Sequence, residues 1–151
     1  MYPLIHKLNF KDQPEVLILN SPDDFMQVLK EFENLAKVDQ KIQPNKYEFI
    51  LIFVKNLIEI KEVAIKIPSI MADDVTLWIA YPKKSSKKYT SDISRDNGWQ
   101  PLGDLGFEGV RQIAIDEDWS ALRFRQAKYI KSLKRDKTMV MSKEGKQKLN
   151  S

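Results

Sequence analysis

Hydrophobic residues in the N-terminal part of the chain follow two periodicities. Continuous apolar runs at 15–20, 49–54 and 75–80 have the length and β-branched content of strands buried on both faces. Between them, apolar residues recur at helical spacing in 25–36 and 57–71. Two strand–helix–strand passages in succession predict a parallel sheet with helices on both sides.

Local residue types predict where these elements begin and end. Asn56 is expected to cap the second helix, and Pro68 predicts that this helix kinks or ends near Ile67. Asp73-Asp74 is expected to form the turn into the strand at 75–80.

The C-terminal part completes the predicted sheet. We expect a short edge strand at 37–42, a helix at 91–102, and an antiparallel hairpin of 110–115 and 119–125. The expected strand order is 2-1-3-4-6-5. The fold class is therefore α/β, a three-layer Rossmann-like domain with a mostly parallel sheet and a C-terminal antiparallel hairpin. We assign this domain to 1–126 and a basic, flexible tail to 127–151.

Composition excludes several kinds of site. The chain has no Cys, one His and five Gly, and no Gly precedes Gly98. Cysteine nucleophiles and thiolate or His-cluster metal sites are therefore excluded, and no metal is predicted. Without glycine, 20–24 is expected to lack the positive-φ turn that brings a pyrophosphate close to the backbone. The sequence identifies no cofactor.

Positive charge is concentrated at the C-terminus. The formal net charge is +4, but 128–151 alone holds eight basic and two acidic residues. A weak nucleic-acid contact is therefore expected of the tail at most and not of the core, and a solvated extension is the alternative. No run is long enough for a membrane helix and no signal peptide is visible, which predicts a soluble, cytoplasmic protein without membrane contact.

A pattern in the C-terminal part resembles a small bacterial family of domains of unknown function. The pattern consists of Trp78-Ile-Ala-Tyr-Pro-Lys83, Thr90, Asp92, Arg95-Asp96, Gly98-Trp99, Gly106-Phe107, Val110, Gln112, Ala114-Ile-Asp116 and Trp119-Ser-Ala-Leu-Arg-Phe-Arg125. The resemblance implies a Rossmann-like fold and carries no established activity or cofactor. The order of elements is also similar to a shortened class I methyltransferase, although Asn20-Ser21-Pro22 stands where those enzymes have a glycine-rich turn.

Three groups of residues are candidates for a ligand site. After the strand at 75–80, Lys83, Lys84 and the other lysines and serines up to Thr90 could converge on a phosphate-containing small molecule. The alternative for this segment is a flexible solvated loop.

The second group lies in the predicted helix at 91–102. Spacings of three and four residues place Asp92, Arg95 and Asp96 on one helical face, where they could orient a hydroxyl or bind Mg²⁺. The alternative is that Asp92 favours the helix start and Arg95 pairs with a nearby acid.

The third group lies on the last strand. Alternation places Trp119, Arg123 and Arg125 on one face, where an aromatic ring and two guanidinium groups could clamp an aromatic or phosphorylated ligand. The alternative is a sheet face covered by a helix, with the arginine stems packed over Trp119.

Three function hypotheses remain open from the sequence. A non-catalytic ligand-binding or interaction module is favoured, because no nucleophile–base pair can be assembled from the motifs. A divergent transferase or phosphate-ester enzyme using Asp92, Arg95 and Asp96 is the first alternative, and a nucleic-acid contact through the tail is the second.

Overall fold

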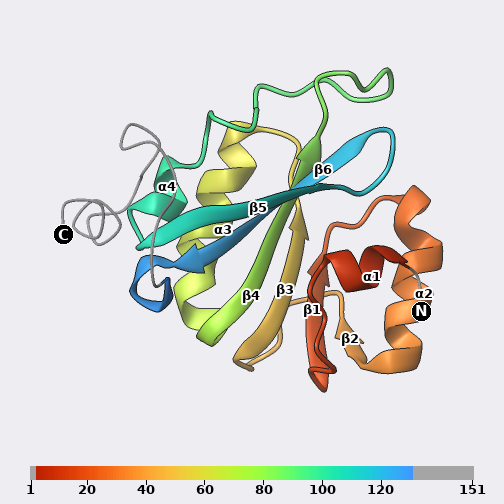
Figure 1. Ribbon diagram of the computed structural model, residues 1–151, viewed down its shortest axis with the longest axis vertical. Coiled ribbons are helices and arrows are strands. Elements are labelled where there is room, and N and C mark those ends of the chain that lie inside the picture. The colour runs from red at the N-terminus through yellow and green to blue at the C-terminus, as the bar shows by residue number, and fades with distance from the viewer. Residues whose placement is uncertain (1–2, 131–151) are drawn as a thin grey trace.

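The computed structural model describes residues 3–130, in which one six-stranded sheet runs through the molecule (Figure 1). The strands are β1 (Glu15–Leu19), β2 (Lys37–Asp39), β3 (Tyr47–Phe53), β4 (Met71–Pro82), β5 (Phe107–Ala114) and β6 (Trp119–Gln126). Their order is β2-β1-β3-β4-β6-β5; β1 to β4 pair in parallel, and β6 is antiparallel to both β4 and β5. The predicted fold class and strand order are confirmed.

Helices cover both faces of the sheet. α1 (Pro3–Lys7) and α2 (Met26–Leu35) lie on one face, and the 3-10 turn η1 (Asp23–Phe25) comes directly before α2. α3 (Leu57–Ile70) and α4 (Gln100–Gly103) lie on the other, and η2 (Ala127–Tyr129) follows β6. From residue 131 onward the predicted basic tail lies outside the described residues, so its proposed nucleic-acid contact stays a prediction.

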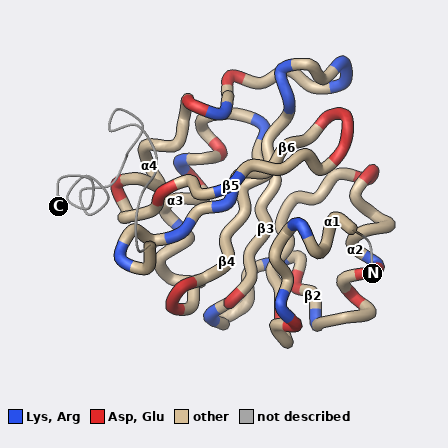
Figure 2. Tube along the Cα trace, viewed as in Figure 1, with Lys and Arg blue, Asp and Glu red and all other residues tan. Residues whose placement is uncertain are grey.

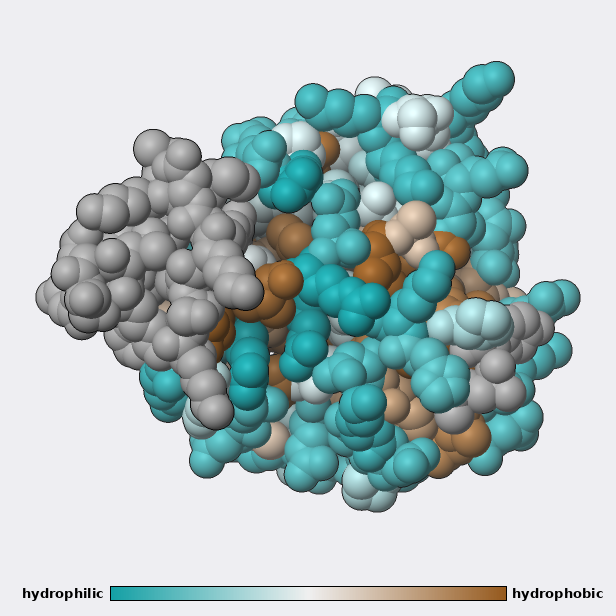
Figure 3. Space-filling model, viewed as in Figure 1, coloured by the Kyte–Doolittle hydropathy of each residue, from teal (hydrophilic) through white to brown (hydrophobic). Residues whose placement is uncertain are grey.

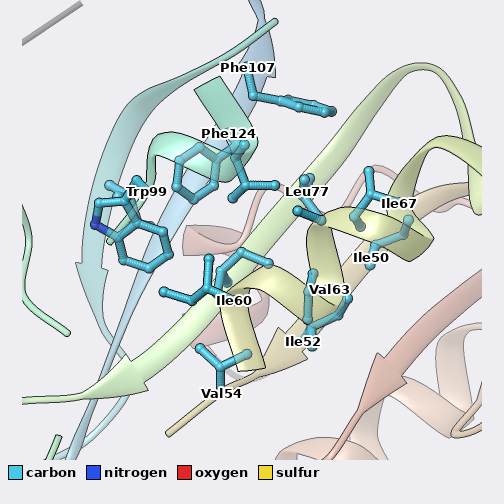
Figure 4. Close-up of a cluster of buried hydrophobic side chains, with 14 of the residues drawn as sticks. Ile50, Ile52, Val54, Ile60, Val63, Ile67, Leu77, Trp99, Phe107 and Phe124 are labelled. Atoms are coloured by element: carbon cyan, nitrogen blue, oxygen red, sulfur yellow. The ribbon is translucent and has the colours of Figure 1, made fainter. Parts of the chain in front are cut away.

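The strand pleat divides the core into two layers. Phe49 and Phe53 of β3 pack in the cluster beneath α1 and α2, whereas Ile50 and Ile52 pack in the cluster beneath α3. Figure 4 shows the second cluster, in which side chains of α3 such as Ile60 meet those of β3 and β4. The continuous apolar runs of the sequence are thus explained by burial on both faces.

α3 lies within the predicted range 57–71 and ends at Ile70. Asn56 is the N-cap, and its side-chain oxygen accepts the Glu59 N–H at 2.9 Å, as expected. Pro68 does not end the helix, which continues to Ile70. A proline removes one N–H donor, and here the next turn is closed because the Met71 N–H still donates to the Ile67 carbonyl.

The prediction that Asp73 and Asp74 form a turn before β4 is wrong. Both belong to β4, where the pairing with β3 slips between Tyr47 and Phe49. Asp74 takes a left-handed φ of 47°, a conformation that aspartate tolerates better than most residues. The irregular pairing keeps the strand continuous past these two acids.

The predicted helix at 91–102 is also wrong, because only the four residues of α4 are helical. Ser94 and Asn97 instead close a tight turn through an isolated bridge, and Gly98 has a φ of 107°. A Cβ at Gly98 would lie 2.4 Å from Leu57 Cδ2 of α3. Trp99 reinforces the turn, since its indole N–H donates to the Ser94 carbonyl at 2.9 Å.

Candidate functional site

The loop after β4 is fixed to the turn between β5 and β6. The Lys83 N–H donates to the Asp118 carbonyl at 2.8 Å, and the Ser86 hydroxyl donates to the Asp118 carboxylate at 2.8 Å. The turn itself is held by Asp116, whose carboxylate accepts the N–H groups of Asp118 and Trp119. The sequence showed an acidic turn and a lysine-rich loop, but not that one secures the other.

A pocket of about 460 Å³ opens beside this loop, on the α4 side of the sheet. Among its lining residues are four of the sequence candidates: Lys83, Lys84, Arg95 and Asp96. The remaining wall comes from the end of β4, the turn before α4, and polar side chains of β5 and β6. These further lining residues are Tyr81, Pro82, Ser85, Ile93, Ser94, Gln112 and Ser120.

Charge at this pocket is mainly positive. Three cationic side chains line it against the single carboxylate of Asp96, and within 3–130 none of the three cations makes an ion pair. Tyr81 is 3% exposed, and its hydroxyl oxygen accepts a hydrogen bond from Gln112 at 2.9 Å. Burial raises the pKa of Tyr81, while the nearby Arg95 charge partly opposes that rise.

Asp92 and Thr90 are not part of this pocket. Thr90 is exposed on the loop, and Asp92 accepts the Leu57 N–H of α3 at 2.9 Å. Asp92 therefore stabilises the first turn of α3. The helix that was predicted to begin near Asp92 does not form. The predicted common helical face of Asp92, Arg95 and Asp96 is wrong.

Replacing Asp92 by alanine is expected to lower the free energy of unfolding by about 1 kcal/mol, because the Leu57 N–H loses its acceptor. Asp92→Asn keeps an acceptor oxygen and should recover most of the loss. Urea unfolding measures both, with the exposed Asp96→Ala as the matched control. Equal effects of Asp92→Ala and Asp96→Ala would contradict the capping role.

Trp119, Arg123 and Arg125 lie on the opposite face of β6 from the pocket. Trp119 is 1% exposed and its ring lies 5.1 Å from those of both Phe53 and Tyr89, so it is part of the core. Arg125 is held by Asp74 through two hydrogen bonds of 2.8 and 2.7 Å. The alternation was predicted correctly, but these residues do not converge with Lys83 and Arg95.

The carboxyl end of β1 differs from the sequence expectation. Asn20 has a φ of 61°, so a positive-φ turn exists there without glycine. Above these strand ends, Lys88 pairs with Asp24 at 2.9 Å, and the Lys55 and Lys88 ammonium groups lie over the Tyr89 ring. The loop after β4 therefore lies across the crevice in which open α/β sheets bind ligands.

An acid at the end of β2 was missed by sequence reasoning. Asp39 lies 8% exposed and accepts the Tyr47 hydroxyl at 2.5 Å. Its place, about 20 residues after the first strand, is where dinucleotide-binding chains carry the acid that accepts ribose hydroxyls. Because the Tyr47 hydroxyl already donates to this carboxylate, the position of Asp39 in the sequence alone does not reveal the role of the acid.

No cluster of three or more His, Asp or Glu side chains within residues 3–130 has a metal-binding arrangement. In the same part of the chain, no helix has the length and apolar character that crossing a membrane requires.

Solved structures of methyltransferases share this fold at low sequence identity. One is a SAM-dependent methyltransferase from Aquifex aeolicus (TM-score 0.52, 11% identity, covering 81% of this chain and 87% of that one). Another is the N-methyltransferase NodS from Bradyrhizobium japonicum WM9 (TM-score 0.50, 9% identity, covering 82% of this chain and 92% of that one). These identities show a common fold alone.

No protein-family model and no curated protein matches the sequence. The resemblance to a bacterial domain family therefore stays a prediction. The similarity to a shortened methyltransferase is supported at the level of the fold.

Proposed function

We propose that the pocket beside β4 binds a small molecule that carries a phosphate group. The observation that supports this proposal is the gathering of Lys83, Lys84 and Arg95 around one cavity, without carboxylate partners in the described part of the chain. Unpaired cations around a concave surface attract an oxyanion, and the guanidinium fork matches phosphate oxygens.

The rest of the pocket suits an uncharged part of the same ligand. Tyr81 and Ile93 are almost fully buried at its base, and Gln112 and Ser120 offer hydrogen bonds from the two hairpin strands. Such a mixture of apolar floor and a few polar groups is typical of small-molecule sites. Among the described residues that line the pocket, Asp96 is the only carboxylate and none is a His, so we propose binding without catalysis.

Arg95→Gln and Lys83→Gln are each expected to weaken binding of a phosphate-bearing ligand by about tenfold, the effect of losing one charge-assisted hydrogen bond. A nucleotide and sugar-phosphate panel is titrated into the full chain by calorimetry. Lys61→Gln, an exposed lysine on α3, is the matched control. The proposal fails if no member of the panel binds, or if all three variants bind equally well.

A divergent transferase is the second candidate, supported by the methyltransferase-like strand order and the left-handed Asn20. The same chain is therefore also titrated with SAM. We expect no saturable rise in melting temperature, because Asp39 is already engaged by Tyr47. A saturable rise that Asp39→Asn abolishes would favour the transferase instead.

A further inference from the structure

Two arginines face each other on the sheet surface opposite the pocket. Arg111 of β5 stands directly across from Arg123 of β6 in the antiparallel pairing, so both side chains leave the same face. In Figure 2 the basic positions of β5 and β6 lie near the centre of the view, and Figure 3 shows hydrophilic side chains gathered there. Like charges placed directly opposite in a sheet are unfavourable.

The acids near this pair are already engaged. Asp74 is the carboxylate whose charge favours the protonated form of Arg123, but Asp74 already accepts two hydrogen bonds from Arg125. Glu108 pairs in register with Arg125 on the same face, is fully buried and is not free. Neither Arg111 nor Arg123 makes an ion pair with any residue of 3–130.

The environment of Arg123 makes its charge costly. Its side chain is only partly exposed, and its Nε–H is shielded from water and has no acceptor among residues 3–130. Its neighbour on β4 is the fully buried Trp78, whose indole N–H already donates to the Leu8 carbonyl at 2.7 Å. Stabilisation of this guanidinium must therefore come through its other nitrogens, and the strand register places Arg111 on the same face.

We propose that Arg111 and Arg123 together bind a phosphate group on the β5–β6 face. The site is separate from the proposed pocket, because the pocket uses Gln112 and Ser120, which alternate to the other face. Two unpaired cations match a phosphate, with its charge of about −1.5 to −2 at neutral pH, better than they match a single carboxylate. Each guanidinium presents a fork that fits two phosphate oxygens.

The direct test follows the side-chain Nε–Hε signals of the arginines by NMR during titration of the full chain with inorganic phosphate. Arg111→Gln and Arg123→Met identify the two signals, and Arg123→Met keeps an apolar stem in the sheet. We expect both signals to shift along one saturable curve in the wild type. Acetate at equal ionic strength should bind about tenfold more weakly, since it offers one charge.

Three variants separate this site from the pocket. Arg95→Gln and Lys61→Gln should leave the phosphate response of Arg111 and Arg123 unchanged, whereas Arg111→Gln should abolish that of Arg123. Without phosphate, Arg111→Gln should melt higher than the wild type, because a like-charge pair is relieved. Linear shifts matching those in chloride, equal affinity for acetate, or a response lost in Arg95→Gln would each overturn the proposal.

Discussion

Replacing Trp119 by alanine is expected to lower the free energy of unfolding by about 3–5 kcal/mol, the usual cost of deleting a large core aromatic. The side chain is 1% exposed and lies between Phe53 of β3 and Tyr89 of the loop after β4. Its removal therefore takes away the contact that seats the loop on the sheet. Urea or guanidinium unfolding followed by circular dichroism measures the change.

The conservative variant distinguishes a core role from a ligand clamp. Trp119→Phe should recover most of the stability, because the indole N–H has no acceptor among residues 3–130 and phenylalanine removes that unpaired donor. Val110→Ala on the neighbouring strand, where Val110 is 40% exposed, is the matched control. If Trp119→Phe instead weakened binding of a phosphorylated ligand, the clamp would be correct.

Between pH 10 and pH 12 the wild type is expected to lose about 2–3 kcal/mol more stability than Tyr47→Phe loses over the same range. Burial, and next the hydrogen bond to Asp39, raise the pKa of Tyr47 from 10.0 to about 12. Above pH 10 the unfolded chain releases this proton while the folded chain retains it. Rising pH therefore favours the unfolded state until the folded hydroxyl ionises as well.

The two proteins are compared by denaturant unfolding at several pH values. At neutral pH, Tyr47→Phe should be less stable because the buried Asp39 carboxylate loses its donor. The difference should shrink progressively between pH 10 and pH 12. Tyr129→Phe, near the end of the described chain, is the matched control. A constant difference across this range would contradict the buried Tyr47–Asp39 pair.

The sheet could be predicted from the sequence because each buried strand carries its own signal. The run at 49–54 is apolar at every position, and β3 is indeed buried on both faces. The hairpin followed from alternation of polar and apolar residues on each side of 116–118. The expected strand order 2-1-3-4-6-5 agrees with the structure.

The errors occurred where a distant contact decides local structure. Segment 91–102 has helical spacing, but Gly98 lies against Leu57 and Asp92 is drawn to the start of α3. Asp73 and Asp74 look like a turn, but pairing with β3 extends the strand through them. None of these partners is near in sequence, so no local pattern contains the information.

Distant contacts also explain why sequence reasoning found only part of the candidate site. Lys83 and Arg95 line the same pocket because the loop after β4 is held by Asp118, some 30 residues away. Arg123 was placed on the correct face, but the opposing Arg111 could be recognised only from the strand register. Asp39 was missed because its hydrogen bond to Tyr47 depends on how β2 and β3 are positioned across β1.

The place of β6 between β4 and β5 has a consequence for the growing chain during synthesis. Residues up to β4 can assemble the parallel half of the sheet, but β4 then presents an open edge, because its partner is made about 40 residues later. The pocket has no second wall until that partner arrives. Translation of the hairpin thus covers the open edge of β4 and completes the wall of the cavity in one event.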